Sequence, residues 1–319
     1  MTDSVPPKLD PREQHFFIES PRDGLKLFLR FLGPIAEAPE VRPVVYVHGA
    51  TFPSGLSIAH RFDGRSWRDE LCEAGFAAWG FDFLGFGLSD RYPEMNEGAE
   101  SQPPLLRAAD AADQLTEVLR FVSARHGHAR VSLICHSWGS FPGCIVASRH
   151  PRLIDRVVLF GPIARRTPGD HEPPSAPGWR LLSIKDQWDR FIEDVPAGAE
   201  AVLSEQHFHE WAHSYLDSDP PSRTRDPPSV KIPTGPFVDI LTAWHGELPY
   251  DPAALNAPVA LIRGEWDSLL PDEDARWLFD AFSSSPEKRD VKISRATHLM
   301  HLERMRHALH RESIAFLHP

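Results

Sequence analysis

The sequence lacks the features of several protein classes. Its three cysteines, Cys72, Cys135 and Cys144, are too few and odd in number for a disulfide framework. Its 34 basic residues are outnumbered by 45 acidic ones, and a formal net charge of -11 argues against nucleic acid or an anionic membrane as a partner. Its longest apolar runs, such as VVYV and VVLF, fall far short of the roughly 20 residues that cross a bilayer.

The start of the chain, MTDSVPPKLDPREQ, also lacks the charged and then apolar layout of a secretory signal peptide. We therefore expect a protein of the reducing cytoplasm with a small-molecule substrate and with no nucleic-acid or membrane partner. The oligomeric state stays open at this stage.

Strand-like and helix-like segments alternate along much of the 319-residue chain. In the first half the patterns predict helices in SWRDELCEAG, residues 105–126 and PGCIVASRHP, and strands in FFIES, LKLFLRFL, PVVYVHGA, FAAWGFDF, RVSLICHS and IDRVVLFGP. Near the end they predict strands in PVALIRGEWD and RDVKISRATH and helices in EDARWLFDAF and RHALHRESIAFL. Alternation of this kind predicts an α/β protein with a mainly parallel, doubly wound sheet.

The segment from Gly161 to Pro258 has a different composition. Its 98 residues hold 15 of the 31 prolines and four tryptophans, Trp179, Trp188, Trp211 and Trp244. Rigid loops with scattered large aromatics predict a cap inserted between strands 6 and 7. The expected domains are a first core part at 1–162, the cap at 163–246 and a second core part at 247–319.

A serine stands where a predicted strand meets a predicted helix, in RVSLICHSWGSFPG. Ser137 and Gly139 fit the last part of the nucleophile-elbow pattern G-x-S-x-G, in which a sharp turn exposes the serine hydroxyl. Cys135 replaces the first glycine, so neighbouring side chains must leave room for its sulfur.

Four motifs, in order, resemble those of the α/β-hydrolase superfamily: VHGA, DFLGFGLSD, CHSWGS and THLMHLE. The resemblance runs from about residue 19 to the C-terminus and implies the α/β-hydrolase fold. In that fold the catalytic residues follow in the order Ser, Asp or Glu, His, each after a strand. Ser137, Asp267 and His298 satisfy both the order and the context.

The resemblance also implies the role of each residue. Ser137 would attack a carbonyl carbon, His298 would move the proton, and Asp267 would orient the imidazole. The backbone amides of Ala50 and Trp138 would form the oxyanion hole. The implied enzyme is a serine hydrolase of small or medium apolar carboxylic esters, thioesters or lactones that requires no metal or organic cofactor.

Other residues compete for these roles. His301 is the alternative to His298, and the alternatives to Asp267 are Glu265, Asp272 and Asp274. We expect Asp272 to cap the helix in EDARWLF instead. Cys135 is expected to be a small buried residue rather than a nucleophile, and Asp82 is expected to be a structural residue of its turn.

The substrate pocket is expected to involve His136, Trp179, Trp188, Trp211 and Trp244, although the tryptophans could equally form a core of the cap. Two further side chains, Arg165 and Arg166, are interpreted as surface charges, with a carboxylate anchor as the alternative.

The segment HEWAH, His209 to His213, matches the H-E-x-x-H pattern of zinc peptidases. The favoured interpretation is a cap helix with an apolar face of Phe208, Trp211 and Tyr215 and no metal, because no second motif supplies a third ligand.

Four alternative functions remain open. CHSWGS resembles the elbow of proline iminopeptidases, which favours an aminopeptidase that would hold a substrate ammonium with Glu205 or Glu210. An amidase or a C–C bond hydrolase could use the same triad, and a non-catalytic binding protein could use the same fold.

Overall fold

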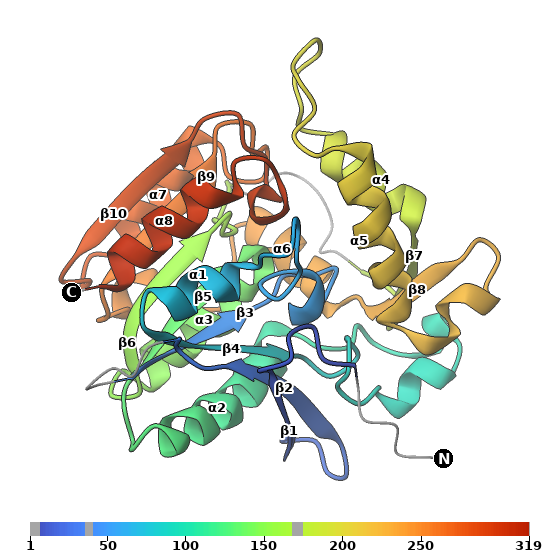
Figure 1. The fold of residues 1–319 in the computed structure, drawn as a ribbon, viewed down its shortest axis with the longest axis horizontal. Coiled ribbons are helices and arrows are strands. Elements are labelled where there is room, and N and C mark those ends of the chain that lie inside the picture. Colours follow the sequence, from blue (N-terminus) through green and yellow to red (C-terminus); the bar gives the residue numbers. More distant parts are fainter. Residues whose placement is uncertain (1–6, 36–40, 168–174, 319) are drawn as a thin grey trace.

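The computed structural model describes residues 7–35, 41–167 and 175–318, and its centre is an eight-stranded sheet (Figure 1). The strand order is β1-β2-β4-β3-β5-β6-β9-β10, antiparallel from β1 to β4 through β2 and parallel elsewhere. The strands are β1 Gln14–Glu19, β2 Lys26–Leu32, β3 Arg42–Val47, β4 Phe76–Asp82, β5 Val131–His136, β6 Ile154–Phe160, β9 Val259–Gly264 and β10 Lys288–Ile293.

Every residue of β4, β5 and β9 is buried, as expected for parallel strands covered on both faces. The mainly parallel, doubly wound sheet that the sequence predicts is therefore confirmed.

Helices cover both faces of this sheet. Apolar side chains of α1 (Trp67–Glu73) and α8 (Arg306–Leu317) pack on one face. Those of α2 (Ala108–Arg125), α3 (Ser140–Arg149) and α7 (Asp272–Ala281) pack on the other. Short 3-10 turns lie at η1 Ser54–Leu56, η2 Pro93–Asn96, η3 Ala99–Ser101, η4 Ser137–Gly139, η5 Pro220–Thr224, η6 Pro252–Ala254 and η7 Met300–Leu302.

The insertion lies between β6 and β9, the sixth and seventh strands of the main sheet. It contains β7 Trp179–Ser183, α4 Ile184–Ile192, α5 Glu205–Asp217, β8 Ser229–Pro233 and α6 Gly235–Trp244. β7 and β8 form their own antiparallel sheet, which the sequence analysis did not foresee. In Figure 1, α4, α5, β7 and β8 gather on the side of the molecule opposite β10. The domain boundaries expected after residues 162 and 246 stay predictions. Residues 168–174, which belong to the expected cap, lie outside the described residues.

Trp211 joins the insertion to the rest of the chain. Its fully buried ring lies 5.1 Å from that of Phe52 and 5.3 Å from that of Phe191, between centroids. Its indole N–H donates to the carbonyl oxygen of Leu56 at 2.9 Å. Since α5 carries Phe208, Trp211 and Tyr215 on its buried face, the helix predicted around HEWAH is correct.

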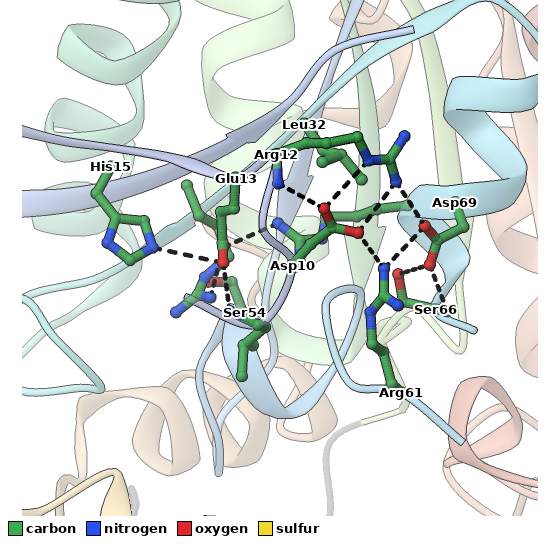
Figure 2. Close-up of polar contacts among 12 residues, drawn as sticks. Asp10, Arg12, Glu13, His15, Leu32, Ser54, Arg61, Ser66 and Asp69 are labelled. Atoms are coloured by element: carbon green, nitrogen blue, oxygen red, sulfur yellow. Dashed lines mark hydrogen bonds and ion pairs between the residues drawn. The ribbon is translucent and has the colours of Figure 1, made fainter. Parts of the chain in front are cut away.

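Charged side chains attach the segment before β1 to the core (Figure 2). Asp10 and Asp69 both form ion pairs with Arg12 and with Arg61. Next to this group, the buried carboxylate of Glu13 pairs with Arg30 at 2.8 Å and with Arg68 at 3.0 Å. The polar start of the chain is therefore part of the folded structure from residue 7 onward, and residues 1–6 lie outside the described ones.

Within residues 7–35, 41–167 and 175–318, no helix has the length and apolarity needed to cross a bilayer. Cys72, Cys135 and Cys144 are all buried with free thiols.

Candidate active site

Ser137 lies at a sharp turn between β5 and the helical segment formed by η4 and α3. Its φ angle is +53°, a left-handed conformation that is rare for a side chain with a Cβ. Glycines allow the neighbouring strand end to approach: a Cβ on Gly139 would lie 2.5 Å from the carbonyl oxygen of His48. On Gly49 a Cβ would lie 3.2 Å from the Cβ of Ser137. The backbone conformation and the close packing are those expected of a nucleophile elbow.

The sulfur of Cys135 is accommodated by a glycine in the following helix. A Cβ on Gly143 would lie 2.4 Å from Sγ of Cys135, closer than real Cβ atoms come to a neighbour. The glycine missing from the strand is thus replaced by one in α3. Burial raises the pKa of the Cys135 thiol well above its usual value, which agrees with the interpretation as a small buried residue.

Asp267 and His298 are brought together at the carboxyl ends of β9 and β10. Nδ1 of His298 lies 3.0 Å from each carboxylate oxygen of Asp267, and both side chains are buried. Gly161, after β6, leaves room for the pair, since a Cβ there would lie 3.0 Å from Nδ1 of His298. Nε2 of His298 is buried and makes no hydrogen bond to any described residue.

The charge state of this pair follows from its surroundings. Burial raises the pKa of the Asp267 carboxyl, but the adjacent His298, the backbone N–H of Leu269 and the charge of Arg190 outweigh it. The net pKa of Asp267 is lowered, so the carboxylate is ionised at neutral pH. An ionised carboxylate accepts a hydrogen bond from Nδ1–H of His298. In the neutral ring the proton therefore sits on Nδ1, and Nε2 carries the free lone pair.

His136 connects the elbow to His298. Its ring lies 5.1 Å from that of His298, between centroids, and its Nε2–H donates to the carbonyl oxygen of His298 at 3.1 Å. The ring stacks on Phe160 at 4.4 Å, and burial holds its pKa well below the usual value. The neutral imidazole of His136 thus contacts the segment that carries His298, and its role in the substrate pocket stays a prediction.

Three residues that the sequence analysis left without a catalytic role shape the loops around the site. His48 donates from Nδ1 to the carbonyl oxygen of Gly49 at 2.8 Å and accepts at Nε2 from the N–H of Phe83 at 3.1 Å. Asp82 accepts from the backbone N–H of Ser54 at 2.9 Å and of Leu88 at 3.0 Å. Asp82 is the structural turn residue that the sequence predicts.

Glu303 is the third of these residues. It accepts hydrogen bonds from the backbone N–H and the hydroxyl of Thr297, next to His298. Burial raises the pKa of Glu303 to about 7, against the effect of these hydrogen bonds. Its only sequence signal is its place five residues after His298 in THLMHLE.

The backbone amides predicted for the oxyanion hole lie on the two segments that meet at the elbow. Ala50 follows the end of β3, and Trp138 follows Ser137 directly. The indole N–H of Trp138 donates to Asp239 of α6 at 3.0 Å, so this residue is also bound to the insertion. The role of the two amides stays a prediction.

The competing residues are engaged elsewhere. Glu265 is exposed and accepts from Ser294 and Arg295. His301 packs its ring between those of Phe52 and Phe160. The expectation that Asp272 caps α7 is wrong: Pro271 is at the N-cap, and Asp272 forms ion pairs with Arg263 and Lys292.

The predicted cap tryptophans lie in four different surroundings. Trp211 belongs to the buried core of the insertion, and Trp188 lines an apolar cavity of about 160 Å³ together with Phe191 and Leu203. Trp179 donates to the carbonyl oxygen of Glu97 at 3.1 Å. Trp244 lies under the guanidinium of Arg166, 4.4 Å from its ring centroid. Their contribution to a substrate pocket stays a prediction.

Arg165 and Arg166 line a larger cavity of about 560 Å³, together with Asp274 and Trp277. Arg166 donates to Asp274 at 2.8 Å, and the guanidinium of Arg165 lies 4.9 Å from the ring centroid of Trp277. Arg165 is exposed, in agreement with its interpretation as a surface charge, whereas Arg166 is half-buried and paired with Asp274. The alternative, a carboxylate anchor, stays open.

The two histidines of HEWAH are both exposed on α5. Among the described residues, His209 and His213 do not belong to any group of three or more side chains placed to hold a metal ion.

A family model described as "alpha/beta hydrolase fold" matches residues 42–304. Curated proteins gave no match. Among solved structures, a bromoperoxidase from Bacillus anthracis is similar, with a TM-score of 0.64 and 17% identity over 96% of this chain and 100% of that one. An esterase from Exiguobacterium antarcticum has a TM-score of 0.61 and 18% identity over 95% and 99% of the two chains.

An epoxide hydrolase from Vigna radiata has a TM-score of 0.60 and 14% identity over 96% of this chain and 98% of that one. At these identities the likeness shows the fold alone, and the three names describe different reactions.

Proposed function

Because this chain belongs to the α/β-hydrolase fold family, we propose that it is a serine hydrolase whose catalytic residues are Ser137, His298 and Asp267. The observation that supports this most is the buried His298–Asp267 pair. The backbone of His298 accepts a hydrogen bond from His136, the residue before a serine with φ of +53°. A protein that only bound ligands would need neither the pair nor the strained serine.

The reaction follows from the order of these groups. Ser137 is a weak nucleophile on its own, and the unpartnered Nε2 of His298 is the base that would take its proton as Oγ attacks a carbonyl carbon. Asp267 stabilises the imidazolium that forms. His298 then gives the proton to the leaving group, and a water molecule activated by the same imidazole releases the acyl group from Ser137.

The developing oxyanion would be held by the backbone N–H groups of Ala50 and Trp138. Each such donor is worth on the order of 10²–10³ in rate in other hydrolases. The start of α3 directs the positive end of its helix dipole to the same place. This chemistry requires no metal or organic cofactor.

The proposed substrates are small or medium apolar esters, thioesters or lactones. Only 5% of the surface of Ser137 is exposed, and the insertion supplies an apolar interior that includes Phe208, Trp211 and Tyr215. We propose that residues 163–246 form a cap that closes over the acyl group and excludes water. We also propose a cytoplasmic location, because Cys72, Cys135 and Cys144 are buried as free thiols.

A first test is the intact mass after treatment with a fluorophosphonate. The wild type should gain one adduct, and Ser137→Ala should gain none. Ser140→Ala is the matched control, because Ser140 is a buried serine of the same turn whose hydroxyl has no described hydrogen-bond partner. An unlabelled but folded wild type, or a labelled Ser137→Ala variant, would refute the proposal.

The bond that is cleaved needs a second comparison. An aryl ester should turn over much faster than a proline arylamide. The aminopeptidase alternative would need Glu205 or Glu210 to hold a substrate ammonium, yet both are exposed on α5. Faster cleavage of the arylamide would favour that alternative.

A further inference from the structure

Three side chains that commonly bind metals converge where α1 and α8 meet. Glu70 lies on α1, and His307 and His310 lie on α8, three residues apart and therefore on one face of the helix. Nδ1 of His307 lies 2.9 Å from Oε1 of Glu70, and Nδ1 of His310 lies 3.1 Å from the same oxygen. All three ligand atoms are within 4.8 Å of one another.

The surroundings fix part of this group and leave the rest open to solvent. The side chain of His310 is 3% exposed, and its ring stacks on Trp67 at 4.6 Å and 15°. Half of the His307 side chain is exposed, so one side of the group is accessible. Such a site combines rigid ligands with an entry path.

His310 is also incompletely satisfied. The only polar partner of its Nδ1 in the described part of the chain is Glu70, and its Nε2 has no hydrogen-bond partner there. A buried imidazole without such a partner is costly. A metal ion at Nδ1 would satisfy the nitrogen that points toward Glu70.

We propose that Glu70, His307 and His310 form a binding site for Zn²⁺, with water at the fourth position. Two imidazole nitrogens and one carboxylate oxygen are a common ligand set for this ion. Tetrahedral bonds of about 2.0–2.2 Å place ligand atoms about 3.4 Å apart. The two distances to Glu70 are slightly shorter than this, and the two imidazole nitrogens lie within 4.8 Å of each other. A small side-chain adjustment therefore admits the ion.

The charges of the ligands agree with this assignment. Burial by itself would raise the pKa of Glu70, but His310 and His307 outweigh this effect and lower the pKa to about 2. Glu70 is therefore ionised at neutral pH. Burial lowers the pKa of His310 and so favours the neutral imidazole that binds metals. The positive charge of the nearby Arg306 disfavours a bound cation. This guanidinium is itself paired with the carboxylate of Asp63.

A bound ion would connect α1 with the helix that follows His298 in the chain. Because it binds only the folded arrangement of α1 and α8, Zn²⁺ should stabilise the native protein. The site uses none of the proposed catalytic residues, so it can be tested apart from hydrolysis.

The experiment is a titration of the purified, metal-free protein with ZnCl₂ at pH 7.5 by isothermal calorimetry. The wild type should bind one equivalent. Loss of a residue that merely supports a ligand costs about 10- to 100-fold in metal affinity. Removal of a ligand in His307→Ala or Glu70→Gln should therefore weaken binding by at least about tenfold.

HEWAH provides the matched control. A His209→Ala/His213→Ala variant removes two exposed histidines one helical turn apart and should keep the wild-type affinity. At the same Zn²⁺ concentration, the melting temperature should rise more for the wild type and for this control than for His307→Ala. If Glu70→Gln fails to fold, His307→Ala still decides, since His307 is half exposed.

Two outcomes would overturn the proposal. One is a wild type that shows no saturable binding of Zn²⁺. The other is binding that survives His307→Ala and disappears in the His209→Ala/His213→Ala variant, which would assign the metal to α5.

Discussion

At the scale of single residues, Cys135 and Gly143 show how an uncommon side chain is accommodated beside the elbow. The strand residue is larger than the glycine of the usual pattern, and the helix residue is a glycine at the point of contact. Because protein interiors are closely packed, the two positions should depend on each other energetically.

A double-mutant cycle tests this dependence. Gly143→Ala should destabilise the protein by roughly 1–3 kcal/mol, the usual cost of overpacking, although alanine favours helices by about 1 kcal/mol. In a Cys135→Gly background the same change should be neutral or stabilising. Urea unfolding of the four proteins gives the coupling energy. Equal effects of Gly143→Ala in both backgrounds would show that the sulfur does not decide the size of residue 143.

At the scale of elements, Asp239 joins three parts of the fold. Its carboxylate accepts from the backbone N–H of Ala108 at 2.7 Å, from Arg107, and from the indole of Trp138. The side chain of Arg107, the N-cap residue of α2, accepts no hydrogen bond from the helix. Asp239 of α6 caps the helix instead. Asp239 therefore connects the insertion, a core helix and the elbow.

Removal of this carboxylate should destabilise the protein. A hydrogen bond to a charged group contributes roughly 1.5–3 kcal/mol, so Asp239→Ala should cost several kcal/mol and Asp239→Asn less, because the amide oxygen can still accept. Urea midpoints measure both. Asp110→Asn is the control, since Asp110 is an exposed acidic residue in the first turn of the same helix. An Asp239→Ala variant no less stable than the control would contradict this role.

At the scale of the whole molecule, buried ion pairs attach the N-terminal segment to the core. Burial raises the pKa of Glu13, but His15, Arg30 and Arg68 outweigh it, and the net pKa is well below the usual range. A lowered carboxyl pKa stabilises the fold at pH values above the unfolded pKa, near 4.5. This stabilisation is lost as the pH falls from there toward the folded pKa.

Glu13→Gln should therefore cost about 3–5 kcal/mol at pH 7, because it leaves the buried guanidinium of Arg68 without its anionic partner. The difference from the wild type should shrink as the pH falls below about 4. Denaturant unfolding at several pH values measures it. Glu19→Gln is the control, since Glu19 is an exposed strand end and should change little at any pH. A pH-independent difference would assign the effect to packing instead of charge.

The sequence by itself determined the order of strands and helices in the main sheet and its cover, the position of Ser137 at a strand-to-helix turn, and the presence of an insertion between the sixth and seventh strands. These features depend on local chemistry: alternation of apolar residues, β-branched runs, and glycines near the turns. The pairing of Asp267 with His298 was implied by the resemblance to α/β hydrolases, and it agrees with the rule that residues after parallel strands meet at one edge of a sheet.

Only the tertiary structure decided which side chains compensate for one another across elements. Gly143 opposite Cys135, Asp239 at the start of α2 and Glu70 beside two histidines of α8 join residues up to 240 positions apart. A sequence pattern reports the neighbours of a residue along one helix or strand. The contacts that place these groups arise when separate elements pack, so burial, pKa and access to the site depend on the fold as a whole.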